Sequence, residues 1–284
     1  MPDVSVLDST MHYVETGEGD PIVLLHGNPT SSFLWRKVIP GLSGEGRVLA
    51  PDLIGMGRSG KPDIGYRFAD HARYLDAWFD ALALERVSLV GHDWGGALGF
   101  HWARRHPDRV AAVALMETIV KPVGSDEWPE TAREIFQGFR MPGTGEQMVL
   151  DQNLFVEAVL PGAMLHQLTA EEMETYREPF REPAHRLPTL VWPREIPIDG
   201  EPADVAQLVD SYGRWLASSE DVPKLLLTFE PGAIMSAPVV QWCRDNIAAL
   251  EVAPAGQGIH FVPEDEPEAI ASLVGDWRRR VLAG

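Results

Sequence analysis

The chain has 284 residues, of which 45% are hydrophobic and 23% charged, a composition typical of one globular α/β domain with room for an inserted subdomain. Its formal net charge of −18 argues against nucleic acid or an anionic membrane surface as a partner. The single cysteine, Cys243, excludes a disulfide within the chain. The sequence has no signal-peptide pattern and no apolar run of roughly 18 residues, so we expect a soluble, cytoplasmic protein.

The first part of the chain alternates between strand and helix patterns. Predicted strands cover residues 4–7, 11–16, 22–25, 47–50, 87–90 and 110–116, and predicted helices cover residues 33–39, 68–84 and 97–103. Segment 22–25 is apolar throughout, as is typical of a strand that is covered on both faces of a parallel sheet. The alternation predicts a mostly parallel sheet with helices on both faces.

The pattern changes after residue 118. Residues 119–199 are rich in proline, glutamate and aromatic residues, with helical stretches near 127–139, 153–160 and 170–177 and no convincing strand. Strand patterns resume at 224–229 and 250–253, and a helix is predicted over 267–282. We therefore expect a core domain formed by residues 1–118 and 200–284, with residues 119–199 inserted as a helical cap.

A glycine-rich segment at residues 55–60 matches the pattern G-x-G-x-x-G. In a dinucleotide-binding site a helix opens within that loop. Here Pro62 follows, and it delays the next predicted helix to about Phe68. The segment is therefore interpreted as a surface loop that binds no cofactor.

The stretch 88–96 predicts a strand, a sharp glycine-flanked turn and a helix. This arrangement resembles the nucleophile elbow of α/β-hydrolases, in which the central side chain of G-x-S-x-G is exposed above the sheet. Asp93 occupies the central position. A carboxylate attacks as an anion and forms an ester, which indicates displacement at carbon instead of acyl transfer.

Such an ester must be hydrolysed, so a base is needed to activate water. His260 follows the last predicted strand, and the order of nucleophile first and histidine last is that of α/β-hydrolases. His92 neighbours Asp93, but adjacent side chains on an elbow point apart. His101 and His106 fall on or beside the following helix, where a structural role is expected.

The acid that orients the base has two plausible places in this fold. The loop after strand 224–229 offers Glu230, and the end of strand 110–116 offers Glu117. Glu117 follows a mostly apolar strand, and a buried carboxylate without a partner is costly. We therefore favour Glu117 over Glu230.

Departure of an anionic leaving group requires hydrogen-bond donors. Asn28 and Trp94 are suitable because an amide N–H and an indole N–H are neutral and do not pair permanently with the Asp93 carboxylate. Either residue can instead have a structural role, Asn28 in a turn and Trp94 in packing. Both are predicted to bind the leaving anion.

Several motifs together resemble those of the haloalkane dehalogenases, specifically the subfamily with an Asp-His-Glu triad and an Asn-Trp halide pair. They are Gly-His-Asp-Trp-Gly at 91–95, His-Gly-Asn-Pro at 26–29, Met-Glu at 116–117, and segments 52–62, 99–102, 151–153, 176–180 and 195–198. The resemblance covers nearly the whole chain. Segment 233–236 departs from the family pattern.

The resemblance implies an α/β-hydrolase fold and a two-step reaction. Asp93 displaces halide from a haloalkane, Asn28 and Trp94 bind the halide, and His260, supported by Glu117, activates the water that cleaves the alkyl ester. No metal or organic cofactor is implied, the partners are haloalkane, water and halide ion, and the oligomeric state, monomer or dimer, stays open. By position, the predicted apolar lining of the substrate pocket is Ile135, Phe136, Phe139, Phe155, Ala163, Ile234 and Phe261.

Three other functions share parts of this pattern. Epoxide hydrolases use a similar elbow with two cap tyrosines, but residues 119–199 contain only Tyr176. Coelenterazine-oxidising luciferases, with a monooxygenase-like activity, retain much of the same constellation. A non-catalytic receptor of this fold is disfavoured because Asp93, Glu117 and His260 are all present.

Overall fold

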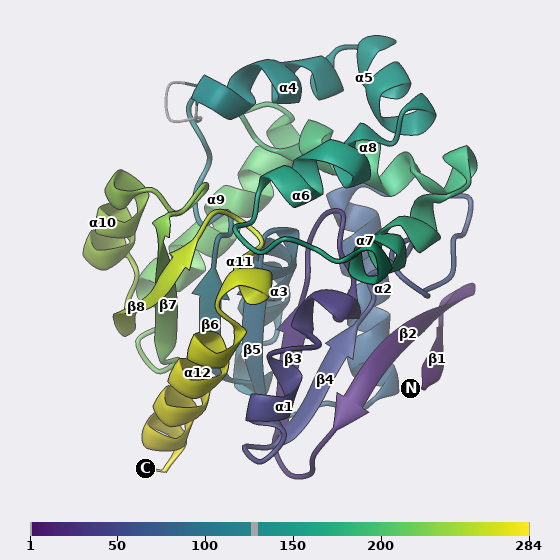
Figure 1. Ribbon diagram of the computed structural model, residues 1–284. Coiled ribbons are helices and arrows are strands. Elements are labelled where there is room, and N and C mark those ends of the chain that lie inside the picture. Colours follow the sequence, from purple (N-terminus) through teal and green to yellow (C-terminus); the bar gives the residue numbers. More distant parts are fainter. Residues whose placement is uncertain (1, 126–129, 284) are drawn as a thin grey trace.

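A computed structural model describes residues 2–125 and 130–283. Its described strands form one sheet in the order β1-β2-β4-β3-β5-β6-β7-β8, in which β1, β2 and β4 pair antiparallel and the pairs from β4 onward are parallel (Figure 1). The strands are β1 (Asp3–Val6), β2 (Ser9–Thr16), β3 (Pro21–Leu25), β4 (Arg47–Pro51), β5 (Val87–His92), β6 (Val110–Met116), β7 (Lys224–Pro231) and β8 (Leu250–Gly258). The predicted mostly parallel sheet is confirmed.

Helices cover both faces of the sheet (Figure 1). Apolar residues of α2 (Phe68–Ala81), α3 (Trp94–Arg105) and α9 (Ala203–Ser218) share one buried cluster with one face of the strands. Residues of α1 (Ile39–Leu42) and α12 (Pro267–Leu282) share a second cluster with the other face. The strands at the centre are therefore buried on both sides, which explains why β3 and β5 lack the polar alternation of half-exposed strands.

The segment between β6 and α9 is helical and lies over the carboxyl ends of the parallel strands (Figure 1). Its helices are α4 (Glu130–Arg140), α5 (Thr144–Glu146), α6 (Leu160–Gly162), α7 (Ala170–Arg177) and α8 (Leu187–Glu195), with short π and 3-10 turns at Gln147–Asp151, Phe155–Val159, Glu178–Phe180 and Pro183–His185. Of the helix predicted near 127–139, residues 127–129 lie outside the described residues. A β-bridge between Val123 and Ile198 joins the two ends of the segment.

Several predicted elements differ from the observed ones. The helix expected at 33–39 is divided into a 3-10 turn at Ser32–Trp35 and α1. Helices α8, α9 and α10 (Ala237–Asn246) were not among the predicted elements. A signal for α9 was present, because Val205, Val209, Tyr212 and Leu216 recur at helical spacing and are buried.

The glycine-rich loop at 55–60 contains no helix, and α2 begins at Phe68 as predicted. The Asp52 carboxylate accepts backbone N–H groups from Ser32 at 2.6 Å and from Arg58 at 2.8 Å, which anchors this loop. Elsewhere in the fold, none of the described helices has the length and apolar character needed to cross a bilayer.

Candidate active site

Asp93 lies in the sharp turn between β5 and α3, with φ 51° and ψ −131°. Its backbone N–H donates to the Glu117 carbonyl at 3.0 Å, and the Thr118 hydroxyl donates to the Asp93 carbonyl at 2.6 Å. Two residues later, position 95 must be glycine, because a Cβ at Gly95 would lie 2.3 Å from the Leu25 carbonyl oxygen. The strained turn is therefore fixed by the neighbouring strands, as a nucleophile elbow requires.

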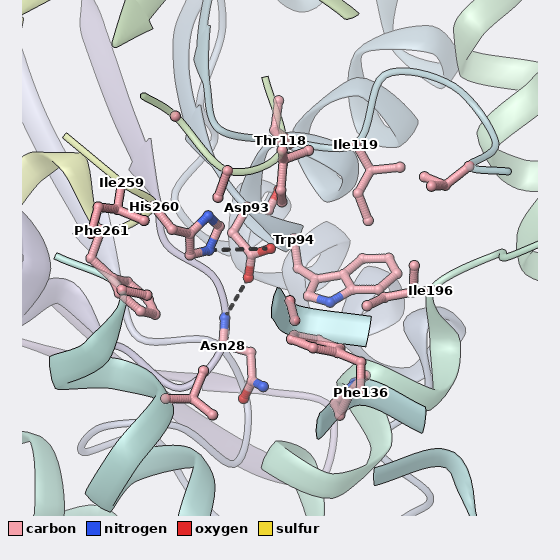
Figure 2. A pocket seen from close by; sticks show the side chains of 18 of the residues that line it. Asn28, Asp93, Trp94, Thr118, Ile119, Phe136, Ile196, Ile259, His260 and Phe261 are labelled. Atoms are coloured by element: carbon pink, nitrogen blue, oxygen red, sulfur yellow. Dashed lines mark hydrogen bonds and ion pairs between the residues drawn. The ribbon is translucent and has the colours of Figure 1, made fainter. Parts of the chain in front are cut away.

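The Asp93 carboxylate is almost fully buried, with 7% of the residue exposed. Its Oδ2 accepts the backbone N–H of Asn28 at 2.9 Å (Figure 2). A Cβ at Gly27 would lie 2.2 Å from that oxygen, so only glycine permits this approach. Burial raises the pKa of Asp93, while the positive charge of His260 and the N–H of Asn28 act in the opposite direction and favour the anion.

His260 follows β8 and lies between two carboxylates. Its Nε2 is 3.9 Å from Oδ1 of Asp93 (Figure 2). Its Nδ1 is 3.5 Å from Oε2 of Glu117. Burial lowers the pKa of His260, but the interaction with Glu117 and the negative charge of Asp93 outweigh it, so the pKa is raised above its ordinary value of 6.5. The imidazole can therefore accept a proton beside the nucleophile and remain stabilised as a cation.

Glu117 directly follows β6 in a left-handed conformation, with φ 42°, and is fully buried. Its carboxylate accepts backbone N–H groups from Ala233 at 3.0 Å, Ile234 at 2.8 Å and Met235 at 3.2 Å. These three donors compensate the burial of the charge. Glu230 is exposed, whereas Glu117 lies beside His260. The donors to Glu117 come from segment 233–236, where the sequence departs from the family pattern.

Asn28 and Trp94 both line the cavity into which Asp93 opens (Figure 2). The Asn28 amide Nδ2 lies 3.5 Å from the Thr189 carbonyl, at the limit of a hydrogen bond, so this hydrogen bond is weak. The Trp94 indole stacks on Trp192 of α8, with ring centroids 4.6 Å apart and planes at 24°. The stacking fixes the indole plane next to Asp93.

The cavity has a volume of about 560 Å³ and a mostly apolar lining. Six of the seven predicted lining residues border it, namely Ile135, Phe136, Phe155, Ala163, Ile234 and Phe261. Lining residues that were not predicted include Ile119, Val120, Lys121, Ala158, Pro193, Ile196, Val239 and Ile259. An apolar cavity of this size holds a small molecule by burial and shape, and its polar lining includes Asn28, Asp93 and His260.

Phe139 does not border the cavity, and that prediction was wrong. Its ring is fully buried between Phe136 and Phe155, with centroid distances of 5.6 Å and 5.2 Å. Together with Val149 and Leu190 it forms a small separate core within the inserted helices. Its helical position turns it toward this core instead of toward the cavity.

Known proteins resemble this chain over nearly its whole length. Residues 20–204 match the family described as alpha/beta hydrolase fold. A haloalkane dehalogenase of Sphingobium indicum is 46% identical, and the match covers 98% of this chain and 95% of that protein. A haloalkane dehalogenase of Agrobacterium fabrum is also 46% identical, over 98% of this chain and 91% of that protein. The chain belongs to the haloalkane dehalogenases.

The solved structures agree with this assignment. The crystal structure of a haloalkane dehalogenase from Bradyrhizobium elkani is 46% identical and superposes with a TM-score of 0.97, over 99% of this chain and 98% of that one. That of a haloalkane dehalogenase from Agrobacterium tumefaciens C58 is 45% identical, with a TM-score of 0.95. This dehalogenase is thus a hydrolase acting on carbon–halogen bonds, and the predicted family and fold are confirmed.

One contact of the dehalogenase site was missed by the sequence interpretation. His92, which neighbours Asp93 in the chain, donates from ring Nε2 to the His260 carbonyl at 2.7 Å. Burial lowers the pKa of His92 well below its ordinary value, so this ring is neutral. His92 therefore holds the backbone of the base. Local sequence gave no signal of this contact because residue 260 is 168 positions away.

Among the described residues, His166, Glu172 and Glu264 lie close enough together to suggest a metal site. Two cationic side chains already occupy the group. Lys37 Nζ lies 3.0 Å from Glu264 and 3.2 Å from His166, and Arg36 donates to both Glu172 and Glu264. The negative charge is compensated by these cations, so the group is an ion-pair network.

Proposed function

We propose that Asp93 is the nucleophile that displaces halide from a haloalkane. The observation that carries the proposal is a buried carboxylate, held at an elbow by the Asn28 N–H, at the polar end of an apolar cavity. A carboxylate oxygen that is fixed in this way can attack the halogen-bearing carbon in line with the departing halide. The carbon–halogen bond breaks as the Asp93 ester forms, and the electron pair leaves with the halide.

The second step consumes the ester. His260 takes a proton from water, the resulting hydroxide attacks the ester carbonyl carbon of Asp93, and the alcohol departs as the carboxylate is restored. Glu117 stabilises the imidazolium formed in this step, since its carboxylate lies 3.5 Å from Nδ1. When the ester forms, the negative charge of Asp93 that raises the pKa of His260 is lost. The base is therefore more readily neutral when it is needed.

Asn28 and Trp94 are proposed to bind the departing halide. The amide and the indole both border the cavity beside Asp93 and can donate N–H groups to an anion. Neither group carries a positive charge, so neither forms a permanent ion pair with the nucleophile. Halide stabilisation therefore increases as the carbon–halogen bond breaks.

We further propose that residues 119–199 form a cap over the core of residues 1–118 and 200–284. The cap contributes Ile135, Phe136, Phe155 and Ala163 to the cavity. An apolar wall offers no hydrogen bonds, which suits haloalkanes, since these are held by burial. The cytoplasmic location is a prediction from the lack of a signal-peptide pattern and of a long apolar run in the sequence.

The epoxide hydrolase alternative requires acidic donors from the cap. The one cap tyrosine, Tyr176, donates its hydroxyl to Glu264 and is buried outside the cavity lining. It is therefore not available to protonate an epoxide oxygen. A luciferase-like monooxygenase activity is tested by measuring light output with coelenterazine.

The test of the proposed function is to trap the ester. In His260→Phe, one halide should be released per active site, and mass spectrometry should find an alkyl adduct on Asp93 after incubation with 1,2-dibromoethane or 1-iodohexane. Asp93→Ala is the control and should release no halide above background from brominated and chlorinated C2 to C6 alkanes. Equal halide release by the wild type and Asp93→Ala, or no adduct in His260→Phe, would contradict the proposal.

A further inference from the structure

The peptide of His260 is held from two sides. Its carbonyl accepts the His92 ring N–H at 2.7 Å, which fixes it to the elbow strand. Its N–H and that of Phe261 both donate to the carbonyl of Ala163, at 3.0 Å and 3.1 Å. Ala163 belongs to the inserted helices, so the base is bonded directly to that segment as well as to the core.

The turn that presents the Ala163 carbonyl is itself held by a carboxylate. Oδ1 of Asp265 accepts the backbone N–H groups of Leu165 and His166, both at 2.8 Å. Asp265 ends α11 (Val262–Asp265), the short helix that follows His260. Its second oxygen, Oδ2, is buried and has no hydrogen-bond partner among the described residues. The hydrogen bonds of this carboxylate are therefore directed at the turn.

These contacts close a ring that passes from the base through α11 to the turn and back. We propose that Asp265 is a positioning residue for His260, which holds turn 163–166 so that the Ala163 carbonyl fixes the peptide of the base. This inference rests on the proposed role of His260 in ester hydrolysis. Asp265 is absent from the cavity lining, and its hydrogen bonds among the described residues go to Leu165 and His166, so it acts through the turn and not on the substrate.

Loss of Asp265 should affect the two steps of the reaction differently. Formation of the ester needs Asp93 and the halide donors, which are fixed by β3, β5 and α3. Hydrolysis additionally needs the imidazole to be aligned with the ester and with Glu117. Without Asp265, the N–H groups of Leu165 and His166 lose their acceptor and the turn is free to move away. Misplacement of a catalytic group by a fraction of an ångström slows the step that uses it.

The neighbouring Glu264 does not duplicate this role. Its carboxylate accepts from Arg36, Lys37 and the Tyr176 hydroxyl, which anchors the same short helix to α7 and to the 3-10 turn near residue 35. None of these donors belongs to turn 163–166. Asp265 alone among the described carboxylates bonds to the backbone of that turn.

Single-turnover kinetics separates the two steps. With 1,2-dibromoethane, the first bromide reports ester formation and 2-bromoethanol reports ester hydrolysis. We expect Asp265→Ala to slow hydrolysis about tenfold while the bromide burst stays within about twofold of the wild type. Adduct on Asp93 should accumulate in the steady state and be visible by mass spectrometry.

Two variants serve as controls for this measurement. Asp265→Asn keeps an oxygen that can accept both N–H groups, so its hydrolysis rate should return to near that of the wild type. Asp276→Ala removes an exposed aspartate of α12 that pairs with Arg279, and both of its rates should be unchanged. A general loss of stability would not produce a selective slowing of hydrolysis that asparagine repairs.

The outcomes are separable. Unchanged hydrolysis in Asp265→Ala, or an equal fall in both steps, would overturn the inference. If Asp265→Ala does not fold, Asp265→Glu carries the same test, because it keeps the charge but displaces the carboxylate by one methylene. His260→Phe is run in parallel. Adduct in that variant without an effect at position 265 contradicts only the inference, and no adduct there contradicts the proposed function itself.

Discussion

The Glu117 carboxylate lies 3.5 Å from Nδ1 of His260 while it accepts three backbone N–H groups from residues 233–235. The end of β6 and the loop after β7 are the two places considered for the acid. Both places contribute to the site, because β6 and β7 are adjacent parallel strands and their carboxyl ends lie side by side. One provides the carboxylate, and the other provides the donors that make its burial possible.

Replacing Glu117 with glutamine removes the charge that supports the imidazolium. We expect ester hydrolysis to slow by up to about 10⁴-fold, the magnitude found when the carboxylate partner of a catalytic histidine is neutralised. One of the three N–H donors would then face the amide NH₂, so unfolding free energy should fall by about 1–3 kcal/mol. Single-turnover alcohol formation and urea unfolding measure the two effects. Unchanged hydrolysis would exclude Glu117 from the site.

The pKa of His260 should depend on the state of Asp93. In the free enzyme it lies above 6.5, and ester formation removes the Asp93 charge that contributes to this rise. Since the neutral imidazole is the base, hydrolysis declines as pH falls through its pKa in the ester form. That midpoint should therefore lie below the pKa of His260 measured by NMR in the free enzyme. A midpoint at or above the free-enzyme value would contradict this electrostatic coupling.

Trp94→Phe and Asn28→Ala should each slow the bromide burst by about 10²–10³-fold, the usual cost of losing one donor to a developing anion. Asn28→Ala keeps the backbone N–H that holds Asp93, so the nucleophile stays in place. Trp102→Phe is the matched control, because Trp102 lies on the same helix but stacks on Phe79, away from the cavity. Equal bursts in Trp94→Phe and Trp102→Phe would exclude the indole from halide binding.

Phe136 and Phe139 should respond differently to truncation, although they lie on one helix. Phe139→Ala removes a fully buried ring from the core of the inserted helices and should cost about 3–5 kcal/mol of unfolding free energy. Phe136→Ala enlarges the cavity, so kcat/KM for 1-bromohexane should rise relative to that for 1-bromobutane. A change of substrate preference in Phe139→Ala but not in Phe136→Ala would contradict this placement of the two rings.

The elbow and the acid could be predicted because they depend on short-range patterns. Strand, glycine turn and helix are adjacent around Asp93, and a buried strand end with a lone carboxylate indicates a partner for Glu117. Phe139 was misassigned because helical position alone does not tell which of two apolar environments a ring enters. The inserted helices contain their own small core, which periodicity cannot distinguish from a cavity wall.

The sequence by itself determined the fold class, the family resemblance, and the residue types that surround Asp93. Only the tertiary structure decided what holds those residues in place. The N–H groups of 233–235 reach Glu117, the His92 ring reaches the His260 carbonyl, and Ala163 binds the peptide of the base. In each of these contacts at least one partner is a backbone group, and it belongs to a segment distant in sequence from the other partner. Every residue except proline offers the same backbone N–H and carbonyl, so such contacts leave no mark in residue type.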